Sequence, residues 1–334
     1  QSTAAAQHLA SQEPEFNVGA RRAVPSIINS FIRPFDLSKA PLLRVALLPL
    51  ENDAHIFMVD MHHIISDGTS LELFSRELTA LYSEKDVPPL HIQYKDYAEW
   101  QNSAGQKEKI GKHEEYWLDQ FAGEVPVLEL PYDFSRPAVK RYEGSTLFFE
   151  INEEDASVLN KMAFDSDTTL YTVLLAVYYI FLNKISGRED IVIGTPTAGR
   201  MHAGLEPLIG MFVNSLPVRN YPGCDKRFNE FLQEVKIRLL EAFDHQDYPL
   251  EILVERVAVD RDTSRNPLFD VMLTKSDMDT SVIEIPGLKL APFEYEGQVS
   301  KFDLTLLVQE VEGKLRLSFE YCTELFREET IIRF

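Results

Sequence analysis

Alternation of apolar and polar side chains divides the chain into short strand-like runs and longer helix-like runs. Two apolar runs, 42–48 and 55–61, are joined by a polar turn and predict a pair of adjacent strands. Directly after them, apolar residues recur at helical spacing over 71–81 and predict a helix. The segment 62–68 is therefore predicted to form a tight turn between a strand and a helix.

The rest of the chain continues the mixture of helices and strands. Helical periodicity predicts helices at 112–121, 153–162, 169–184, 228–244 and 328–334. Apolar runs predict strands at 145–151, 190–194, 269–274, 288–295, 302–311 and 315–321. An irregular stretch with three prolines, 125–137, separates the first elements from the others. We therefore predict an α/β fold of two lobes, at 1–124 and 125–334.

Length and charge narrow the class of protein. The 334 residues exceed the roughly 250–300 at which a single core stops growing, which favours two lobes. The 33 basic and 53 acidic side chains give a net charge of -20, which repels phosphate backbones and anionic lipid. We therefore expect neither nucleic acid nor a membrane as a partner. The two cysteines, Cys224 and Cys322, form no paired framework and indicate a reducing, cytoplasmic location.

The segment His62–Gly68, HHIISDG, carries the candidate chemistry. An imidazole with a pKa of about 6.5 can accept or hold the proton of an amine near neutral pH. His63 is the candidate for that role, because alternation along the preceding strand directs His62 to the other side, where it supports the loop. Gly68 leaves room for a substrate carbonyl to approach the backbone, where an amide can donate to the developing oxyanion.

Asp67 has two possible uses, to orient an imidazole or to anchor the loop through a buried arginine. An arginine would depress the pKa of Asp67, and removal of either partner would leave a buried charge costing roughly 3–5 kcal/mol. We predict the anchoring role, with activity lost on mutation because the loop collapses.

Adjacent histidines at the end of a strand are, however, more often structural or metal-binding than acyl-transferring. A metal site needs a third ligand, and the remaining histidines do not lie at a local spacing that supplies one. These are His55, His91, His113, His202 and His245. We therefore expect no bound metal.

The motif MHHIISDGTS at Met61–Ser70 resembles the central motif of the condensation domains of nonribosomal peptide synthetases. Four further segments resemble that family in the same order: Tyr94–Trp100 (YKDYAEW), Ile209–Arg219 (IGMFVNSLPVR), His245–Glu251 (HQDYPLE) and Arg261–Leu268 (RDTSRNPL). The resemblance implies the fold of chloramphenicol acetyltransferase, used as a V-shaped pseudodimer of two lobes around a tunnel. The family's first two motifs are not visible in the segment 1–18, so an incomplete N-terminal lobe is expected.

The resemblance also implies a reaction and its partners. An acyl or peptidyl thioester, carried on the phosphopantetheine arm of an upstream donor carrier protein, is attacked by the amine of an aminoacyl group on a downstream acceptor carrier. The domain itself binds no cofactor, and an adenylation domain is its neighbour. The sequences HHIISDG, HQDYPLE and RDTSRNPLF resemble the motifs of the subtype that takes an L-configured donor.

Further residues receive roles under this resemblance. Arg200, in the loop after the buried strand 191–193, is the first choice as partner of Asp67 across the lobe interface, with Arg219 second. The alternative for Arg200 is a solvated surface position. Asn214 is a candidate lining residue of the tunnel, although it could equally satisfy nearby backbone groups.

Three other motifs receive structural predictions. Trp100 is expected in the core of the first lobe. His245 and Asp247 lie where a helix stops before a proline, so capping and turn formation explain them. Arg265 can anchor the hydrogen-bonded turn at 261–267.

Two alternative functions remain. An epimerisation domain shares the histidine motif but moves a proton at Cα, and the segments 209–219 and 261–268 fit condensation better. A catalytically silent module would only recruit carrier or partner proteins, and such modules tend to lose the second histidine or the Asp-Gly pair. Heterocyclisation domains carry aspartate where His62 stands. Whether His63 acts as a general base or orients the amine is left open.

Overall fold

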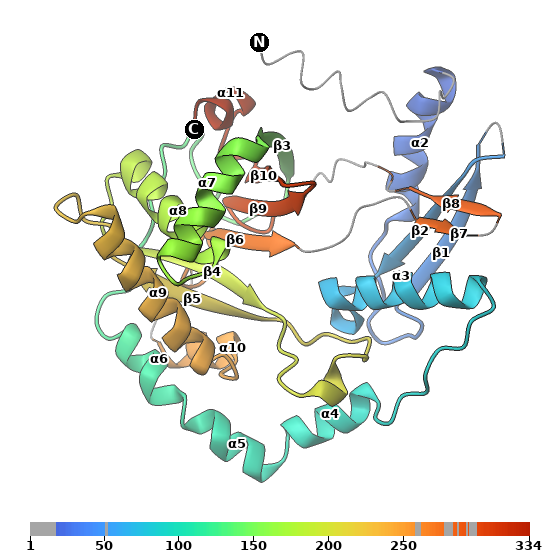
Figure 1. Cartoon of the computed structure of the whole chain (residues 1–334), viewed down its shortest axis with the longest axis horizontal. Helices are drawn as coiled ribbons and strands as arrows, with labels where there is room; N and C mark the ends of the chain where they lie inside the picture. Colours follow the sequence, from blue (N-terminus) through green and yellow to red (C-terminus); the bar gives the residue numbers. More distant parts are fainter. Residues whose placement is uncertain are drawn as a thin grey trace.

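The computed structural model describes residues 18–50, 53–257, 262–276, 283–285, 287–291, 293 and 299–334. Their helices and strands form two α/β lobes of unequal size that lie side by side (Figure 1). A two-stranded sheet belongs to the smaller, N-terminal lobe, and a six-stranded sheet forms the centre of the larger, C-terminal lobe. The two-lobed α/β architecture predicted from the sequence is confirmed.

The N-terminal lobe consists of α2 (Val18–Phe31), β1 (Leu43–Pro49), β2 (His55–Met61) and α3 (Gly68–Tyr82). Strands β1 and β2 are antiparallel, with Leu43 opposite Met61. Val24 and Ile28 of α2 pack against Ile56 of β2 and form a small core. Residues before Val18 lie outside the described part, so the expected incompleteness of this lobe stays a prediction.

Three short helices lead from one lobe to the other: α4 (Tyr94–Gln101), α5 (Ala104–Gly111) and α6 (Glu114–Gln120). Trp117 of α6 is only 2% exposed and packs in the core of the C-terminal lobe, together with Ile110 and Phe121. Its indole Nε1 donates to the carbonyl of His245 at 3.0 Å. The boundary between residues 124 and 125 stays a prediction, and this packing favours an earlier one, before Ile110.

The six-stranded sheet of the C-terminal lobe has the order β3-β10-β9-β6-β4-β5. Its strands are β3 (Gly144–Ile151), β4 (Ile191–Thr197), β5 (Asn214–Asn220), β6 (Val271–Ser276), β9 (Leu304–Val311) and β10 (Lys314–Cys322). Strand β6 runs parallel to its neighbours β4 and β9, and the other pairs are antiparallel. The mixed sheet agrees with the near-continuous apolar run of β4, which is buried along most of its length.

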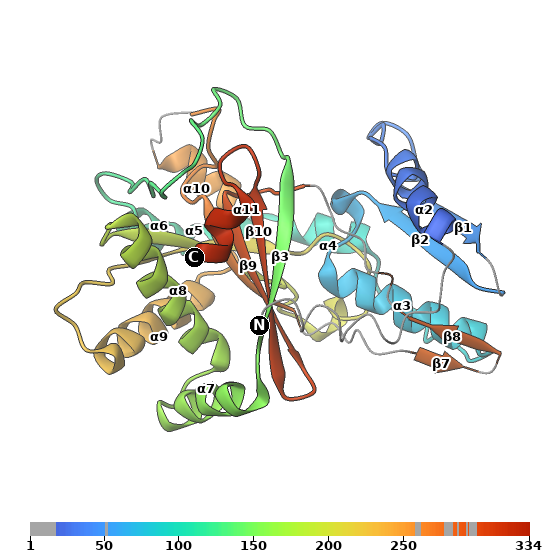
Figure 2. The same ribbon diagram turned by 90° about the horizontal axis from the view of Figure 1, so that it is seen from above.

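Helices α7 (Glu153–Asp165), α8 (Leu170–Ser186) and α9 (Phe228–Asp244) lie on one side of this sheet (Figure 2). Helix α8 begins where the Thr169 side chain accepts from the Thr172 N–H, and it ends at Gly187, whose φ of 67° is the left-handed conformation that suits glycine. Most side chains of α8 are buried, so this helix forms the centre of the main core.

The remaining elements are the short turns η1 (His63–Ile65) and η2 (Ala203–Leu205), helices α10 (Leu250–Arg256) and α11 (Glu328–Arg333), and strands β7 (Ile283–Ile285) and β8 (Leu288–Leu290). The β7–β8 ribbon lies on the side of the N-terminal lobe in both views. The predicted strand at 288–295 is only partly described, because residues 292, 294 and 295 lie outside the described part. Among the described helices, only α7 and α8 taken together, bent by 104°, meet the length and composition of a membrane span.

Candidate active site at the lobe interface

The loop between β2 and α3 begins with His62, which holds the turn η1. The Nδ1 atom of His62 accepts a hydrogen bond from the Ile64 N–H at 3.0 Å. Its backbone N–H donates to the carbonyl of Leu42 at 3.0 Å. The ring also meets Phe35 edge-on, with 6.0 Å between centroids. These contacts give His62 the geometry of a loop-supporting residue.

His63 points its Nδ1 at the carbonyl oxygen of Ser66, 2.7 Å away. A carbonyl oxygen only accepts hydrogen bonds, so Nδ1 carries the proton in this contact. In the neutral imidazole the lone pair then lies on Nε2. The turn η1 therefore selects the tautomer in which Nε2 of the exposed His63 can accept a proton or a hydrogen bond.

Asp67 is the N-cap of α3 and the most heavily bonded side chain of the loop. Its Oδ1 accepts from the Ser70 N–H at 2.8 Å and from the Ser70 hydroxyl at 2.7 Å. Arg200 approaches both oxygens, with Nη1 2.7 Å from Oδ2 and Nη2 3.0 Å from Oδ1, and the Phe212 N–H donates to Oδ2 at 3.1 Å. The side chains of Asp67 and Arg200 are 0% and 5% exposed.

These contacts set the charge of Asp67. Burial alone would raise the pKa of Asp67, but the hydrogen bonds from Arg200, Ser70 and the Phe212 N–H outweigh it and lower that pKa below its usual value. The ionised carboxylate thus ties the loop 62–68 of the N-terminal lobe to the segment between β4 and β5. The structure brings Asp67 and Arg200 together, and the solvated alternative for Arg200 does not hold.

Arg219, the second candidate partner of Asp67, lies elsewhere. It points from β5 to Asp190, with Nη2 2.6 Å from Oδ2, and donates to the carbonyls of Gln120 and Glu124. This arginine therefore joins the end of α6 to the edge of the large sheet. As a partner of Asp67 it is wrong, because its β5 position directs it to a nearer carboxylate within its own lobe.

Asn214, the candidate tunnel residue, is the first residue of β5, and its side chain forms hydrogen bonds with backbone groups. Its Nδ2 donates to the carbonyls of Gln246 and Tyr248, both at 2.8 Å, and its Oδ1 accepts from the Ser215 N–H at 2.9 Å. This supports the backbone-satisfying alternative, and the lining role stays a prediction.

Gly68 is the first residue of α3 and ends the loop 62–68. A Cβ placed on Gly68 would meet no described atom within 4 Å, so packing does not require glycine here. The space is consistent with the approach of a substrate carbonyl, which stays a prediction.

A segment of the C-terminal lobe, residues 208–212, lies against this loop; we call it the strap. The Tyr94 hydroxyl donates to the carbonyl of Met211 at 2.7 Å, and its ring packs edge-on against Phe212, 5.2 Å between centroids. Sequence reasoning assigned no role to Tyr94, Phe212 or Ser70 in this contact. All three belong to segments that resemble family motifs, but the motifs alone do not show that they meet.

Trp100 is not a core residue. It is 37% exposed and meets the ring of His202 edge-on, with 5.2 Å between centroids. The expectation was wrong because α4 lies over the loop that contains η2 instead of inside the first lobe. His245 instead fits its predicted capping position, since it ends α9 and its Nδ1 lies 2.8 Å from the carbonyl oxygen of Glu241.

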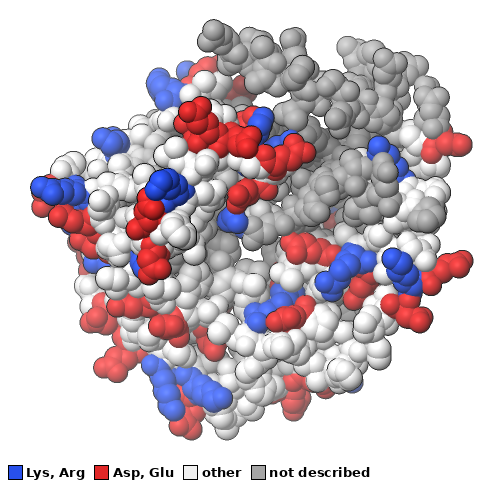
Figure 3. All heavy atoms as spheres, viewed as in Figure 1, with Lys and Arg blue, Asp and Glu red and all other residues white. Residues whose placement is uncertain are grey.

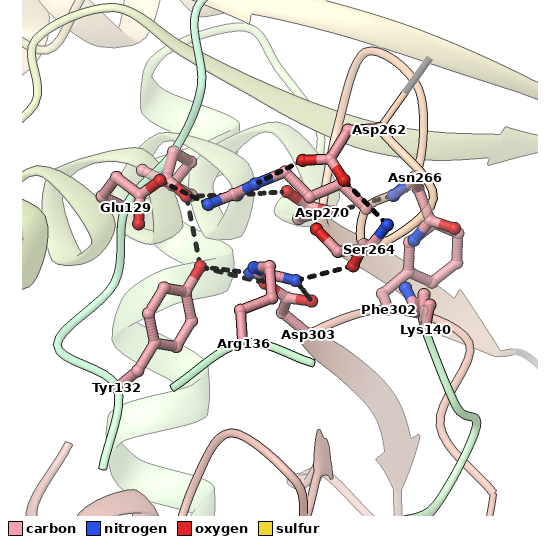
Figure 4. Close-up of polar contacts among 12 residues, drawn as sticks. Glu129, Tyr132, Arg136, Lys140, Asp262, Ser264, Asn266, Asp270, Phe302 and Asp303 are labelled. Carbon is pink, nitrogen blue, oxygen red and sulfur yellow. Dashed lines mark hydrogen bonds and ion pairs between the residues drawn. The ribbon is translucent and has the colours of Figure 1, made fainter. Parts of the chain in front are cut away.

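A second buried cluster, which we call the inner cluster, joins Arg136, Asp303, Tyr132, Arg265 and Asp270 within the C-terminal lobe. Figure 4 labels Tyr132, Arg136, Asp270 and Asp303. Arg136 donates to both oxygens of Asp303 and to the Tyr132 hydroxyl. Arg265 donates to Asp270 at 2.8 Å and pairs with Glu129, so it anchors the turn as predicted. Burial, together with the charge of Asp303, raises the pKa of Asp270.

The surface charge is mixed. On the face drawn in Figure 3, acidic and basic side chains are interspersed over the described atoms. The described residues contain no group of three His, Cys, Asp or Glu side chains arranged to hold a metal ion.

Three comparisons place the chain among known proteins. A family profile described as "Condensation domain" matches residues 7–334. Gramicidin S synthase 2 of Aneurinibacillus migulanus is 47% identical over 311 residues, which are 93% of this chain and 7% of that protein. Bacitracin synthase 1 of Bacillus licheniformis is 49% identical over 306 residues, 92% of this chain and 6% of that protein.

The fold matches as well. A crystal structure of a four-domain nonribosomal peptide synthetase bound to AMP and glycine superposes with a TM-score of 0.84 and 27% identity, covering 92% of this chain and 25% of that one. The chain thus corresponds to a small part of each of these large proteins. It belongs to the condensation domain family of nonribosomal peptide synthetases.

Proposed function

We propose that this chain transfers an acyl or peptidyl group from a thioester to an amine, with His63 facing the reacting amine. The observation that carries the proposal is the 2.7 Å contact from His63 Nδ1 to the Ser66 carbonyl, which leaves the lone pair on Nε2. Asp67 and Arg200 hold that loop between the lobes and touch no reacting atom. The proposal assigns His62 and Asp67 to support and His63 to the chemistry.

The reaction needs one proton transfer. The amine nitrogen of the acceptor attacks the thioester carbon, the new C–N bond forms, and the C–S bond breaks. The proton lost from the amine passes to His63 Nε2 and then to the departing thiolate, so atoms and charge balance. Alternatively His63 only orients the amine through a hydrogen bond, since an amine with a pKa of about 8 can lose its proton to water.

The substrates we propose arrive on carrier proteins. The donor thioester is carried on the phosphopantetheine arm of an upstream carrier, and the acceptor amine on that of a downstream carrier, with an adenylation domain as neighbour. The synthases that resemble this chain are long proteins of which it matches a small part, which supports such a multidomain setting. A donor residue of L configuration and a cytoplasmic location belong to the same proposal.

The direct test mixes the chain with two loaded carrier proteins and measures dipeptidyl thioester by mass spectrometry, using a panel of L- and D-aminoacyl donors. We expect dipeptide, with a higher yield from L donors. Equal or better turnover of D donors would overturn the subtype. Racemised donor without dipeptide would indicate epimerisation, and carrier binding without either product would indicate a recruiting module.

The matched variants are His63→Ala and His55→Ala. Both remove an exposed imidazole, but His55 is the first residue of β2, at the end of the strand away from the loop 62–68. We expect His63→Ala to lower turnover by roughly 10²- to 10⁴-fold, the usual contribution of a positioned acid or base, and His55→Ala to have no effect. Activity that survives His63→Ala would refute the assignment.

The pH dependence of turnover separates the two roles of His63. A general base gives an acid limb in the pH–rate profile that disappears in His63→Ala. If His63 only orients the amine, the variant lowers turnover but keeps the shape of the profile.

A further inference from the structure

The Ser70 hydroxyl lies at the centre of the contact between the lobes. Ser70 is fully buried, at 0% exposure. Its oxygen accepts from Arg200 Nη2 at 3.1 Å and from the Gly210 N–H at 3.0 Å. Its single proton reaches either Asp67 Oδ1 at 2.7 Å or the Gly210 carbonyl at 2.9 Å. The hydroxyl thus uses its full bonding capacity, and both polar groups of Gly210 in the strap lie within hydrogen-bond distance of it.

The strap is held at consecutive points by the side chains around Ser70. Arg200 Nη2 donates to the Leu208 carbonyl at 3.1 Å. The Phe212 N–H donates to Asp67, and the Tyr94 hydroxyl holds Met211. A Cβ at Gly210 would lie 2.1 Å from a ring carbon of Tyr94, so the backbone approaches as closely as glycine allows. A displacement of the strap is therefore transmitted to Ser70 and Asp67.

Asp67 is connected to the His63 ring through a single peptide group. The Ser66 carbonyl that receives the His63 Nδ1 proton belongs to the peptide unit joining Ser66 to Asp67. That unit is planar, so rotation of the Asp67 backbone turns the carbonyl with it. The carboxylate contacts of Asp67 restrict this rotation. The position of the strap is thereby coupled to the tautomer and direction of the His63 ring.

We propose that Ser70 is a positioning residue that sets the tautomer and orientation of His63 through Asp67 and the Ser66 carbonyl. Its effect on turnover rests on the proposed role of His63, whereas its effect on the imidazole does not. Ser70 contacts no substrate in this arrangement. Its removal leaves the buried Gly210 N–H without that acceptor, takes one acceptor from Arg200, and removes the one proton that bonds either Asp67 or the Gly210 carbonyl.

The test compares Ser70→Ala with Ser300→Ala. Ser300 is also 0% exposed, and its hydroxyl donates to the Phe302 carbonyl at 2.7 Å in the C-terminal lobe, away from the loop. Both variants lose one buried hydroxyl, so both are expected to unfold at somewhat lower temperature. The Ser300→Ala variant controls for that loss.

The first readout is the 15N NMR spectrum of the histidine rings in the full chain, with the His63 signals assigned by their loss in His63→Ala. We expect protonated Nδ1 in the unaltered chain and in Ser300→Ala. In Ser70→Ala we expect a substantial population with protonated Nε2. An unchanged His63 tautomer in a folded Ser70→Ala variant would overturn the proposal, whether or not the chain makes dipeptide.

The second readout is kinetic and uses the donor and acceptor carriers that give the best yield with the unaltered chain. Displacement of a catalytic group by about 1 Å can lower a rate on the order of 100-fold. We expect a kcat loss of that order in Ser70→Ala with little change in KM for either carrier, and no loss in Ser300→Ala. Lack of dipeptide from the unaltered chain would count against the proposed function. A normal kcat in Ser70→Ala, with His63→Ala inactive, would count against Ser70 alone.

A conservative variant covers the case in which Ser70→Ala does not fold. Ser70→Cys keeps a small side chain with a weak donor and acceptor. We expect it to lie between Ser70→Ala and the unaltered chain in both the tautomer population and kcat. A Ser70→Cys variant that matched Ser300→Ala in both measurements would refute the positioning role.

Discussion

Among the described residues, the Asp67–Arg200 contact and the inner cluster are buried arginine–carboxylate groups whose electrostatics differ. Between the lobes, a single carboxylate, Asp67, accepts hydrogen bonds from Arg200, Ser70 and the Phe212 N–H. Its pKa is lowered although the side chain is buried. In the inner cluster, two carboxylates lie close together, and burial with the charge of Asp303 raises the pKa of Asp270. The hydrogen-bond donors around Asp67 lower its pKa by more than burial raises it, whereas at Asp270 burial and the charge of Asp303 prevail.

The two clusters also have different structural roles. The inner cluster joins segments of one lobe, from Arg136 to Asp303, and its failure affects that lobe's own stability. The Asp67–Arg200 pair joins residues of different lobes, and Asp67 belongs to the loop that carries His63. A buried ion pair adds little net stability compared with apolar residues of similar size. Removing one partner nevertheless destabilises the fold strongly, because it leaves a buried charge unpaired. The role of each pair therefore follows from the segments that it holds together.

The largest loss of stability is expected for Arg136→Met. The Asp303 side chain is 0% exposed, and without Arg136 it becomes a buried carboxylate lacking its main partner. The free energy of unfolding should fall by roughly 3–5 kcal/mol, measured by urea titration followed by circular dichroism. The double variant Arg136→Met with Asp303→Leu should recover part of the loss. A double variant as unstable as the single one would show that charge is not the cause.

The next effect is expected for Arg200→Met. Asp67 keeps its Ser70 and Phe212 donors, so the loss should lie at the low end of the range for a broken buried pair, about 3 kcal/mol. Dipeptide formation should fall below detection, while hydrogen exchange in α8 and β4 stays slow. Fast exchange in α8 would contradict the separation of the two clusters, because it would place Arg200 in the stability of the C-terminal core.

The two clusters should also respond oppositely to pH. The lowered pKa of Asp67 stabilises the folded chain above the unfolded value of about 3.9, and this contribution is lost as pH falls through the folded pKa. Asp270, with its raised pKa, is protonated in both states at low pH and destabilises the folded chain as pH rises through its folded pKa.

Asn variants isolate these contributions. Relative to the unaltered chain, Asp67→Asn should become less stable as pH rises from 3 to 6, and Asp270→Asn should become more stable over the same roughly three-unit window. Urea titrations at several pH values measure both trends. Parallel trends in the two variants would remove the electrostatic difference between the clusters.

The smallest effects are expected for two tyrosine variants. Tyr132→Phe removes a hydroxyl that accepts from Arg136, and bonds to charged groups contribute about 1.5–3 kcal/mol. Tyr94→Phe removes a neutral bond to the Met211 carbonyl, worth about 1 kcal/mol. Thermal unfolding should therefore rank Tyr132→Phe as the less stable variant, whereas dipeptide assays should show a loss only for Tyr94→Phe. The reverse ranking in both assays would contradict the division of tasks.

Strong periodicity made part of the fold predictable. The predicted ranges 55–61 and 228–244 agree with the bounds of β2 and α9, because each has a regular apolar pattern over its full length. The short helices α4, α5 and α10 were missed, although α6 and α11, of similar length, were predicted. Strand β5 was recognised only as a motif, because its Asn214 and Pro217 interrupt the apolar pattern.

Sequence by itself determined the family and the place of the loop 62–68 between a strand and a helix, because a local motif and a local period lie within neighbouring residues. Tertiary structure decided which of two arginines meets Asp67 and placed Ser70 against Gly210, 140 positions away. It also showed that Trp100 is partly exposed and does not lie in the core of the first lobe. Such contacts depend on how the strap folds back onto the first lobe, and the spacing of residues along the chain does not specify that approach.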